Sequence, residues 1–551
     1  MIVKMKHLDL LCVAGEQEST LKELRALGAV HLDLGAAAGA ATVEAKGVAA
    51  DAEKAVRLIL KARETSEAVE KRPHAVGEVL ACDEERTRLK AELEDIQKEI
   101  RAYEPYGDFD PALAKKLLDL GIELGKVATL PEKLPKRRLG QMRRDEERMQ
   151  NRINILSDKI AGTDEKAILK QFPELKDRIE FEAAKELIER QGSVAVISGW
   201  IPEKLTPAVK EAAAKCGWGL LLRDAAKGEM PPTLIEPPKL FRSVKALFDG
   251  LGIAPAYTEA DVSVPFMCYF SIFFAMLVGD GAYGAIFLAA TLFGWWKTRT
   301  RRTALARSWL IMLTVFSLAT VGWGVLSNTW FGAGLPCCRT WPTVEWLGDA
   351  TYKNMMLLCF TIGVSHLMLA RIWNGVCMLP DSTAVAQFGW AGVLLFMYMV
   401  TNSIVGIFSG IPGWGFAVFG VSLVAVFGFS VKPSELKEKG AELGMLPLNI
   451  MSALGDIISY VRLFAVGLAS VKVAENFNSM ATGLVSSGNA VWLNAIMAAA
   501  MVLILVLGHA LNLAMAGLSI LVHAVRLNTL EFSNHKGVSW SGYAFNPFKK
   551  N

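Results

Sequence analysis

Long apolar runs fill the second half of the chain, and polar positions interrupt them only at intervals. A helix needs about 20 apolar residues to cross a bilayer, and runs of roughly this length or more lie at 264–296, 306–331, 352–374, 384–408, 412–430, 445–482 and 488–530. Gly279-Asp280-Gly281 interrupts the first run, which predicts two helices in a tight hairpin. The last two runs exceed one crossing, so they predict long helices that tilt strongly or project beyond the lipid. The pattern predicts an all-α membrane domain of eight transmembrane helices over 264–532.

The first half alternates polar and apolar positions over short stretches. MIVKMKHLDLLCVA repeats with a period of two, STLKELRALGA has helical spacing and a terminal Gly, and VHLDL alternates again. This order predicts strand, helix and strand over residues 1–35. A similar unit returns near 192–222 as SVAVISGWI, PEKLTPAVKEAAAKCG and WGLLLR. The two units predict a small α/β lobe built from both ends of this half.

Two helical stretches between these units, at about 51–105 and 136–162, carry apolar residues at heptad spacing among dense Glu, Arg and Lys. The apolar positions are Leu89, Leu93, Ile96, Ile100 and Tyr103, then Leu139, Met142, Met149, Ile153, Leu156 and Ile160. They predict an antiparallel coiled coil, with a compact bundle of solvated helices as the alternative. Residues 106–135 would then form a small lobe at its far end.

Charge divides the chain in the same place. Residues 1–261 hold 42 Lys and Arg and 45 Asp and Glu, whereas 262–551 hold only 17 and 10. The second half is too poor in charge for an ordinary water-facing surface, and the acidic excess of the first half gives no footprint for nucleic acid. The predicted organisation is a multidomain chain: a cytoplasmic domain over 1–240, a connector over 241–263, the membrane domain over 264–532 and a cytoplasmic tail over 533–551.

Several kinds of site are not expected. The eight Cys are scattered, which argues against a disulfide or zinc framework, and Cys337-Cys338 are interpreted as two ordinary loop thiols. No GxxxxGK[ST] occurs, so a P-loop nucleotide site is absent. GDGAYG (279–284) matches the letters of a dinucleotide motif but lies within an apolar hairpin, where the glycines would permit a turn and close helix contact. We therefore expect no cofactor and no metal on this chain.

Loop charge predicts the orientation. KTRTRRTALAR (297–307) has five basic and no acidic residues, and VKPSELKEKGAE (431–442) has three Lys, whereas the fifth-to-sixth and seventh-to-eighth loops carry no charge. The positive-inside rule places the basic loops in the cytoplasm. The first residues lack a long apolar run and do not resemble a signal peptide. Both termini are therefore expected on the cytoplasmic side.

Two arginines lie inside the predicted long helices. A charge at mid-membrane costs about 2.5–3.5 kcal/mol on insertion scales, so it indicates function by default. Arg462 has apolar or small residues on both sides, while Arg526 lies nearer a helix end, where its side chain could instead extend to the interface. Small residues share the helix face of Arg462 and would admit a close neighbour: Gly455, Ser459, Ala465 or Val466, and Ala469.

A polar stripe follows the last predicted helix. His509, Asn512, Ala516, Ser519, His523 and Arg526 are spaced 3-4-3-4-3 along it. Such a stripe either packs inside the helix bundle or lines an aqueous path, and its end at an arginine favours the path. His509 and His523 could equally be hydrogen-bonded packing residues.

Four segments make the chain recognisable: SYVRLFAVGLA (459–469), PFMCYFSIFFAMLVGDGAYG (265–284), GHALNLAMAGLSILVHAVRLNTLEF (508–532) and SVAVISGWIPE (193–203). Together with the initial MIVKMKHLDLL they resemble the V/A-type ATPase subunit I, called subunit a in vacuolar enzymes. The resemblance implies that Arg462 is the family's essential arginine and Arg526 its second arginine. Two positions depart from the vacuolar pattern, since Ser470 replaces a His and Ala516 replaces a Glu.

The resemblance also implies partners and a role. The membrane domain would face a proteolipid (c/K) ring, and the cytoplasmic domain would be a stator arm bound to peripheral stalk subunits (E/G type) and a central-stalk-associated subunit (C/d type). The soluble ATPase head would be an indirect partner, so this chain would be a non-catalytic, ion-translocating subunit in the plasma membrane of a prokaryote. The ion would be H+ or Na+.

The implied mechanism uses the fixed charge of Arg462. A guanidinium cannot relay protons, but it can attract an ionised rotor carboxylate and block leakage between two offset half-channels. The polar stripe would line one half-channel, and Asp280, Asp456, Ser459, Tyr460 and Glu531 are further candidates for half-channel residues. The alternatives are a stand-alone secondary transporter or channel with a cytoplasmic coiled-coil regulatory domain, and a non-transporting membrane scaffold.

Overall fold

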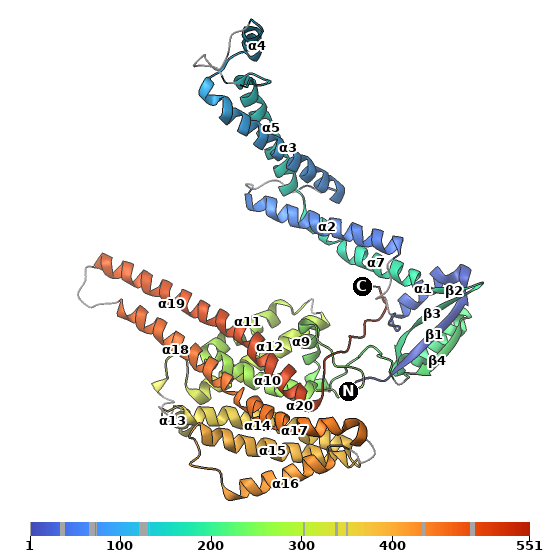
Figure 1. Ribbon diagram of the computed structural model, residues 1–551, viewed down its shortest axis with the longest axis vertical. Coiled ribbons are helices and arrows are strands. Elements are labelled where there is room, and N and C mark those ends of the chain that lie inside the picture. The colour runs from blue at the N-terminus through green and yellow to red at the C-terminus, as the bar shows by residue number, and fades with distance from the viewer. Residues whose placement is uncertain are drawn as a thin grey trace. The chain divides into compact units, whose positions relative to one another are not determined.

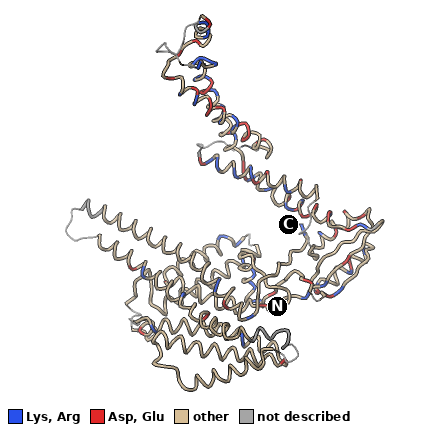
Figure 2. Tube along the Cα trace, in the orientation of Figure 1, with Lys and Arg blue, Asp and Glu red and all other residues tan. Residues whose placement is uncertain are grey.

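The computed structural model describes residues 2–32, 39–65, 72, 74–120, 131, 133–226, 228–300, 303–336, 340–348, 351–431, 436–484 and 491–550. The chain divides into two compact units (Figure 1). The sheet unit comprises Met5–Asp224 and Asn546–Asn551, and the membrane unit comprises Met1–Lys4 and Ala225–Phe545. Figure 2 shows that charged residues crowd the sheet unit and are sparse in the membrane unit.

A four-stranded antiparallel sheet organises one end of the sheet unit. Its order is β2 (Glu189–Gln191), β3 (Val194–Pro202), β1 (Met5–Val13) and β4 (Gly219–Asp224). Alternate residues of β1 face the core, where Leu8 and Leu10 are fully buried against α1 (Gln17–Leu27). The strands predicted from period-two alternation at both ends of this half are thus confirmed, as is the helix α8 (Thr206–Cys216) between β3 and β4.

The predicted strand VHLDL is shorter than expected. Its described residues contribute one bridge, in which His31 and Trp200 exchange backbone hydrogen bonds of 2.8 Å. The short strand β2 pairs only with Val194–Val196, and His31 pairs further along the same edge of β3. The edge is therefore shared by two short segments.

Antiparallel helices form the rest of the sheet unit. They are α2 (Ala40–Thr65), α3 (Val76–Tyr103), α4 (Pro111–Asp119), α5 (Leu139–Ala161), α6 (Glu165–Leu169) and α7 (Phe172–Glu186). Polar pairs run in opposite directions along α3 and α5, from Arg152–Glu85 at 2.9 Å to Arg143–Glu104 at 2.7 Å. Residues 51–105 are not one continuous helix, because α2 ends at Thr65 and α3 begins at Val76. Residues 121–130 and 132 of the predicted far lobe lie outside the described residues.

Glu186 at the end of α7 caps the start of α2. Its carboxylate accepts hydrogen bonds from the backbone N–H of Gly39 and from both the N–H and the hydroxyl of Thr42, at 2.7–3.0 Å. These bonds satisfy donors that the first turn of a helix leaves without partners. The hydrogen bonds from Thr42 lower the pKa of the Glu186 carboxyl below its ordinary value.

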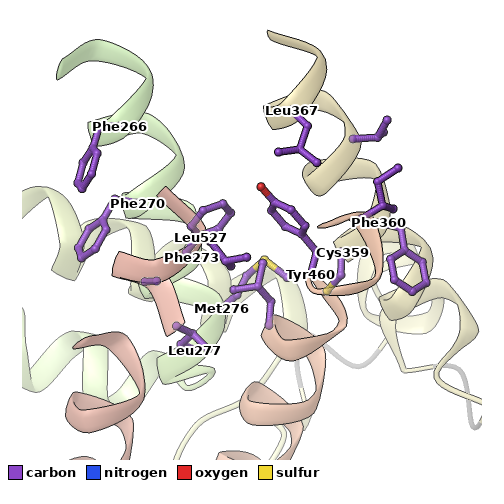
Figure 3. Close-up of a cluster of buried hydrophobic side chains, with 14 of the residues drawn as sticks. Phe266, Phe270, Phe273, Met276, Leu277, Cys359, Phe360, Leu367, Tyr460 and Leu527 are labelled. Atoms are coloured by element: carbon purple, nitrogen blue, oxygen red, sulfur yellow. The ribbon is translucent and has the colours of Figure 1, made fainter. Parts of the chain in front are cut away.

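The membrane unit consists of packed apolar helices. They are α9 (Val244–Leu251), α10 (Ser263–Val278), α11 (Gly281–Lys297), α12 (Ala304–Ser327), α13 (Pro342–Leu347), α14 (Lys353–Met378), α15 (Thr383–Ile404), α16 (Gly413–Phe429), α17 (Leu436–Ile458), α18 (Val461–Gly483), α19 (Val491–Ser519) and α20 (Ser533–Lys536). Figure 3 shows side chains of α10 and α14 meeting Tyr460 and Leu527 in their common core. Cys337 and Cys338 lie outside the described residues.

Among the described residues, five helical stretches are long and apolar enough to cross a membrane: Ala304–Ser327, Lys353–Met378, Thr383–Ile404, Gly444–Gly483 and Ile496–Lys536. Ser263–Val278 and Gly413–Phe429 are apolar but shorter. The 16 residues of α10 span about 24 Å at 1.5 Å per residue, less than the roughly 30 Å of hydrocarbon in a bilayer.

The helix break predicted at Gly279-Asp280-Gly281 is confirmed, but α10 and α11 scarcely contact each other and both pack against α12, so they do not form a tight hairpin. α10 ends at Val278 and is capped by Gly279, whose φ of 71° is a left-handed conformation that favours glycine, and α11 begins at Gly281. A Cβ on Gly284 would lie 2.8 Å from the backbone nitrogen of Val321 in α12. The glycines thus provide the turn and the close helix contact.

The two long C-terminal stretches are not regular helices. A turn at Ser459 and Tyr460 separates α17 from α18, and α19 continues through two π-helical turns, Ile520–Ala524 and Leu527–Phe532, into α20. The segment predicted as a cytoplasmic tail then divides between the two units. Phe548 is buried in the core of the sheet unit, and its N–H donates to the Val30 carbonyl at 2.7 Å.

Candidate functional site

Arg462 lies in the first turn of α18, directly after the turn that separates α18 from α17. Its side chain is 24% exposed. Among the described residues, none covers the face of these two helices that includes Arg462. The exposed residues on it are Leu448, Met451, Gly455, Ile458, Ala465 and Ala469. The small residues predicted to admit a close neighbour thus include three that line this open face.

Arg526 and Glu531 join Arg462 from the end of the following stretch. The Glu531 carboxylate oxygen Oε1 lies 3.4 Å from Nε of Arg526 and 3.7 Å from Nη1 of Arg462. The Glu531 side chain is 6% exposed, whereas that of Arg526 is 55% exposed. One buried carboxylate therefore faces two guanidinium groups, one of which lies on the surface of the chain.

The part of the predicted polar stripe around His509 and Asn512 forms a hydrogen-bonded network with three other helix positions. Asn512 Nδ2 donates to the Tyr283 hydroxyl at 3.0 Å and to the Ser470 carbonyl at 2.9 Å. The Ser470 hydroxyl donates to Asn512 Oδ1 at 3.1 Å. His509 contacts the Tyr283 hydroxyl through Nδ1 at 2.8 Å and Asn478 Oδ1 through Nε2 at 3.2 Å. Ser470, where the vacuolar pattern has His, is thus a buried partner of the stripe.

The part of the stripe that follows Asn512 in sequence takes no part in this network. Ala516 is buried, and the partly buried Ser519 is the last residue of α19. His523 lies in the first π-helical turn, within reach of the charges of both Arg462 and Arg526. The π-helical turns end the 3.6-residue spacing on which the predicted stripe depends.

A second polar chain links Asp456 to residues that the sequence reasoning did not single out. His535 Nε2 contacts Asp456 Oδ2 at 3.0 Å, and Arg371 Nε donates to His535 Nδ1 at 3.0 Å. Arg371 also donates to Gln387 Oε1 at 3.2 Å. A guanidinium N–H can only donate, so His535 Nδ1 is the acceptor and the ring proton on Nε2 points at Asp456. Arg371 could have been found from sequence by the rule applied to Arg462, because it is also a charge within a long apolar run.

Three further predicted residues have defined local partners. The Ser459 hydroxyl donates to the backbone carbonyl of Asp456 at 2.6 Å. Tyr460 is fully buried, with its hydroxyl 2.9 Å from His366 Nδ1. Asp280 is 1% exposed, and its two oxygens accept the backbone N–H groups of Ala282 and Gly332, each at 2.8 Å. In this arrangement Tyr460 belongs to the core and Asp280 caps α11.

A cavity of about 310 Å³ lies beside α18. It reaches from Leu463, next to Arg462, to the ion pair of Lys472 and Glu475, whose charged atoms are 2.7 Å apart. Its other walls come from α10, α12, α13 and α14. No group of three or more potential metal ligands occurs within the described parts of the chain.

No protein-family model matches the chain. It is similar to the V-type ATP synthase subunit I 1 of Treponema pallidum, 27% identical over an alignment of 637 positions that covers both chains entirely. It is 33% identical over 380 residues to the V-type ATP synthase subunit I of Borreliella burgdorferi, covering 64% of this chain and 60% of that protein. The A-type ATP synthase subunit I of Methanocaldococcus jannaschii is 25% identical over 393 residues, covering 64% of this chain and 55% of that protein. The chain thus spans about three fifths of the Borreliella relative and the full length of the Treponema relative.

Proposed function

Because the chain is a homologue of the V-type and A-type ATP synthase subunits I, we propose that it is the membrane stator subunit of a rotary V/A-type ATPase or ATP synthase. It supplies the essential arginine, Arg462, and the half-channels through which H+ or Na+ reaches a proteolipid (c/K) ring. It carries no nucleotide site and acts within the complex as an ion-translocating subunit.

The observation that carries this proposal is a charged arginine on an uncovered apolar face. Leu448 and Met451 are each more than 60% exposed on the face of α17 and α18 that includes Arg462. An exposed apolar face of this kind marks a contact with lipid or with another membrane protein. A guanidinium facing lipid would be costly, so a partner helix with a carboxylate is the chemically suitable neighbour. The ring of the homologous complexes would supply such a carboxylate.

The charge of Arg462 gives the face its role. Each rotor carboxylate would cross the lipid in neutral form and ionise when it meets Arg462, which releases its ion. Because the guanidinium stays protonated at all physiological pH values, it does not pass the ion on. It therefore separates an entry path from an exit path.

Two features of the membrane unit suit these paths. The cavity beside α18 leads from the Lys472–Glu475 ion pair toward Leu463, and we assign it to the extracytoplasmic half-channel. The chain of Asp456, His535 and Arg371 lies on the other side of Arg462 along α17 and α20, and we assign it to the cytoplasmic half-channel. The stripe residues His509 and Asn512 hold α11, α18 and α19 together beside the first path through their hydrogen bonds to Tyr283 and Ser470.

The proposal extends to topology and partners. Eight transmembrane helices, of which α10, α11 and α16 have only 16 or 17 residues, place residues 1–261 and the segment after 532 in the cytoplasm, and the positive loop at 297–307 supports this orientation. The sheet unit acts as the stator arm, with α3 and α5 as its coiled coil, and binds peripheral stalk subunits of E/G type and a central-stalk-associated subunit of C/d type. The membrane is the plasma membrane of a prokaryote.

The test measures ATP-driven ion uptake and ATP hydrolysis in parallel, in vesicles that carry the assembled complex, for the wild type and Arg462→Ala. We expect uptake to fall by about 100-fold or more while the complex remains assembled. Undiminished uptake by Arg462→Ala would overturn the proposal. Uptake by the purified chain alone, without a ring or an ATPase head, would identify a stand-alone transporter instead.

A further inference from the structure

The winding of the last helical stretch decides which side chains meet Arg526. Arg526 and Glu531 are five residues apart, which on an α-helix separates two side chains by about 140° around the axis. In a π-helix the hydrogen bonds join residues five apart, so such residues lie above one another. Leu527–Phe532 is π-helical, and the carboxylate of Glu531 accordingly lies 3.4 Å from Arg526 Nε.

Glu531 is a buried carboxylate whose ion-pair partners are the two arginines; the next carboxylate, Asp456, is itself paired with His535. Its side chain is 6% exposed, and within the described parts of the chain its Oε2 accepts no hydrogen bond. Nη1 of Arg462 likewise has no hydrogen-bond acceptor among the described residues. A buried anion of this kind persists only beside opposite charge, and the guanidinium groups of Arg462 and Arg526 supply that charge.

The contacts of Glu531 with the two arginines leave Arg462 able to change its partner. Hydrogen-bonded ion pairs have nitrogen–oxygen distances of about 2.7–2.9 Å, whereas Glu531 lies 3.7 Å from Arg462 and 3.4 Å from Arg526. Charge attraction therefore holds the group together without the directional bonds that would fix Arg462 to Glu531. Arg462 can therefore turn toward a rotor carboxylate that arrives at the open face without breaking a hydrogen bond to Glu531.

We propose that Glu531 is the internal counter-ion of the two arginines and competes with the rotor carboxylate for Arg462, an inference that rests on the proposed function. Two guanidinium groups and one carboxylate leave a single positive charge for the incoming rotor carboxylate. Without Glu531 two positive charges would hold that carboxylate too tightly to let it leave. Without Arg526 the remaining pair would be neutral and would attract it too weakly.

This role differs from that of a half-channel residue. A group that carries the ion must itself exchange a proton with water, whereas Glu531 is buried between Arg462 and Arg526, whose positive charges favour its ionised form. The two roles predict opposite results for the double variant Arg526→Gln/Glu531→Gln, which has lost the carboxylate but again carries one net positive charge.

The experiment compares the wild type with Glu531→Gln, Arg526→Gln and the double variant in vesicles with the assembled complex, measuring ATP-driven ion uptake and ATP hydrolysis. We expect each single variant to lower uptake by about tenfold, and the double variant to recover to within about threefold of the wild type. The exposed pair of the sheet unit, Glu211→Gln/Lys215→Gln, is the matched control and should match the wild type, because both side chains lie at the surface.

A double variant no better than Glu531→Gln would overturn the proposal and assign Glu531 to the ion path or to the fold. If Glu531→Gln does not assemble, the double variant is compared with the wild type directly, and failure of the double variant to assemble or transport also overturns it. Arg462→Ala is measured alongside. If Arg462→Ala loses uptake and the double variant Arg526→Gln/Glu531→Gln does not recover it, only the counter-ion role of Glu531 is refuted. If Arg462→Ala keeps full uptake, the proposed function itself is refuted.

Discussion

The last two long helical stretches contain two polar regions, which differ in whether their polar groups are joined by hydrogen bonds. Around Asn512, neutral side chains from α11, α18 and α19 satisfy one another through hydrogen bonds of 2.8–3.1 Å. In the other region, the Glu531 carboxylate lies 3.4 Å from Arg526 and 3.7 Å from Arg462 without a hydrogen bond to either. The two regions lie within 20 residues of each other along the same helical stretch.

This difference separates a rigid region from one that can change partners. A fully satisfied buried network fixes the helices that contribute to it, because every displacement breaks a hydrogen bond. Charges that are paired but not hydrogen-bonded can be redistributed when another charge arrives. The neutral network thus holds α11, α18 and α19 together beside a site whose contacts can alternate.

The largest effect is expected from a change that keeps the charge of Arg462 and alters its shape. Arg462→Lys replaces a planar fork by a compact ammonium, which can lose its proton when desolvated. We expect ATP-driven ion uptake to fall by about 100-fold. Arg526→Lys is the control, because Arg526 is 55% exposed and needs to supply only charge. Near-normal uptake by Arg462→Lys would contradict the importance of the guanidinium.

A smaller effect is expected at His535, a side chain that links the charged residues Arg371 and Asp456 through hydrogen bonds. Arg371 donates to its Nδ1 and the ring contacts Asp456 through Nε2. A glutamine can reproduce both bonds, accepting through Oε1 and donating through Nε2. We expect His535→Ala to lower uptake by about tenfold and His535→Gln to retain most of it. Equal loss in both variants would show that the imidazole itself carries the ion.

A change in the neutral network should affect stability before transport. Asn512→Leu leaves the Tyr283 hydroxyl and the Ser470 carbonyl without their donor. We expect a loss of about 1–3 kcal/mol in the free energy of unfolding, seen as a lower melting temperature of the complex in detergent. Tyr283→Phe should cost less, about 0.6 kcal/mol. If Asn512→Leu lost uptake but kept normal stability, Asn512 would belong to the ion path rather than to the packing of the helices.

The smallest effect is expected at an exposed glutamate, in contrast to the buried Glu531. Hydrogen bonds from Thr42 lower the pKa of Glu186, so its ionised form stabilises the start of α2. This contribution is complete above the ordinary glutamate pKa of about 4.3 and is lost as the pH falls through the lower pKa of the folded state. Glu186→Gln should therefore exchange amide hydrogens at the start of α2 faster than the wild type at pH 7. At pH 3, where the wild-type carboxylate is largely protonated, the two proteins should differ much less. Unchanged exchange at pH 7 would contradict the capping role.

The spacing of apolar residues and the positions of glycines were sufficient to predict the elements that depend on nearby residues alone. The period-two alternation around Leu8 and Leu10 predicted β1, and the glycines at 279 and 281 predicted the break between α10 and α11. Arg462 could be singled out because its cost in an apolar helix is visible in the sequence alone.

The contacts of the candidate site could not be predicted in the same way. The stripe was derived from 3.6-residue spacing, and the π-helical turn at Leu527–Phe532 abandons that spacing, so the pairing of Arg526 with Glu531 was hidden. Arg371 and His535 are 164 residues apart and meet only through helix packing. The break at Ser459 and Tyr460 carries no proline or glycine, the usual sequence signals for a break.

The segment that follows the membrane helices has a mechanical consequence. Phe548 is buried in the core of the sheet unit, with the guanidinium of Arg25 5.5 Å from its ring. The backbone therefore connects the two units after Lys4, after Asp224 and again after Phe545. A single connecting peptide would carry any reaction force alone, whereas three share it. The two units are thus joined by their own chain in triplicate, and detaching Phe548 would remove one of these connections together with a buried aromatic side chain of the sheet unit.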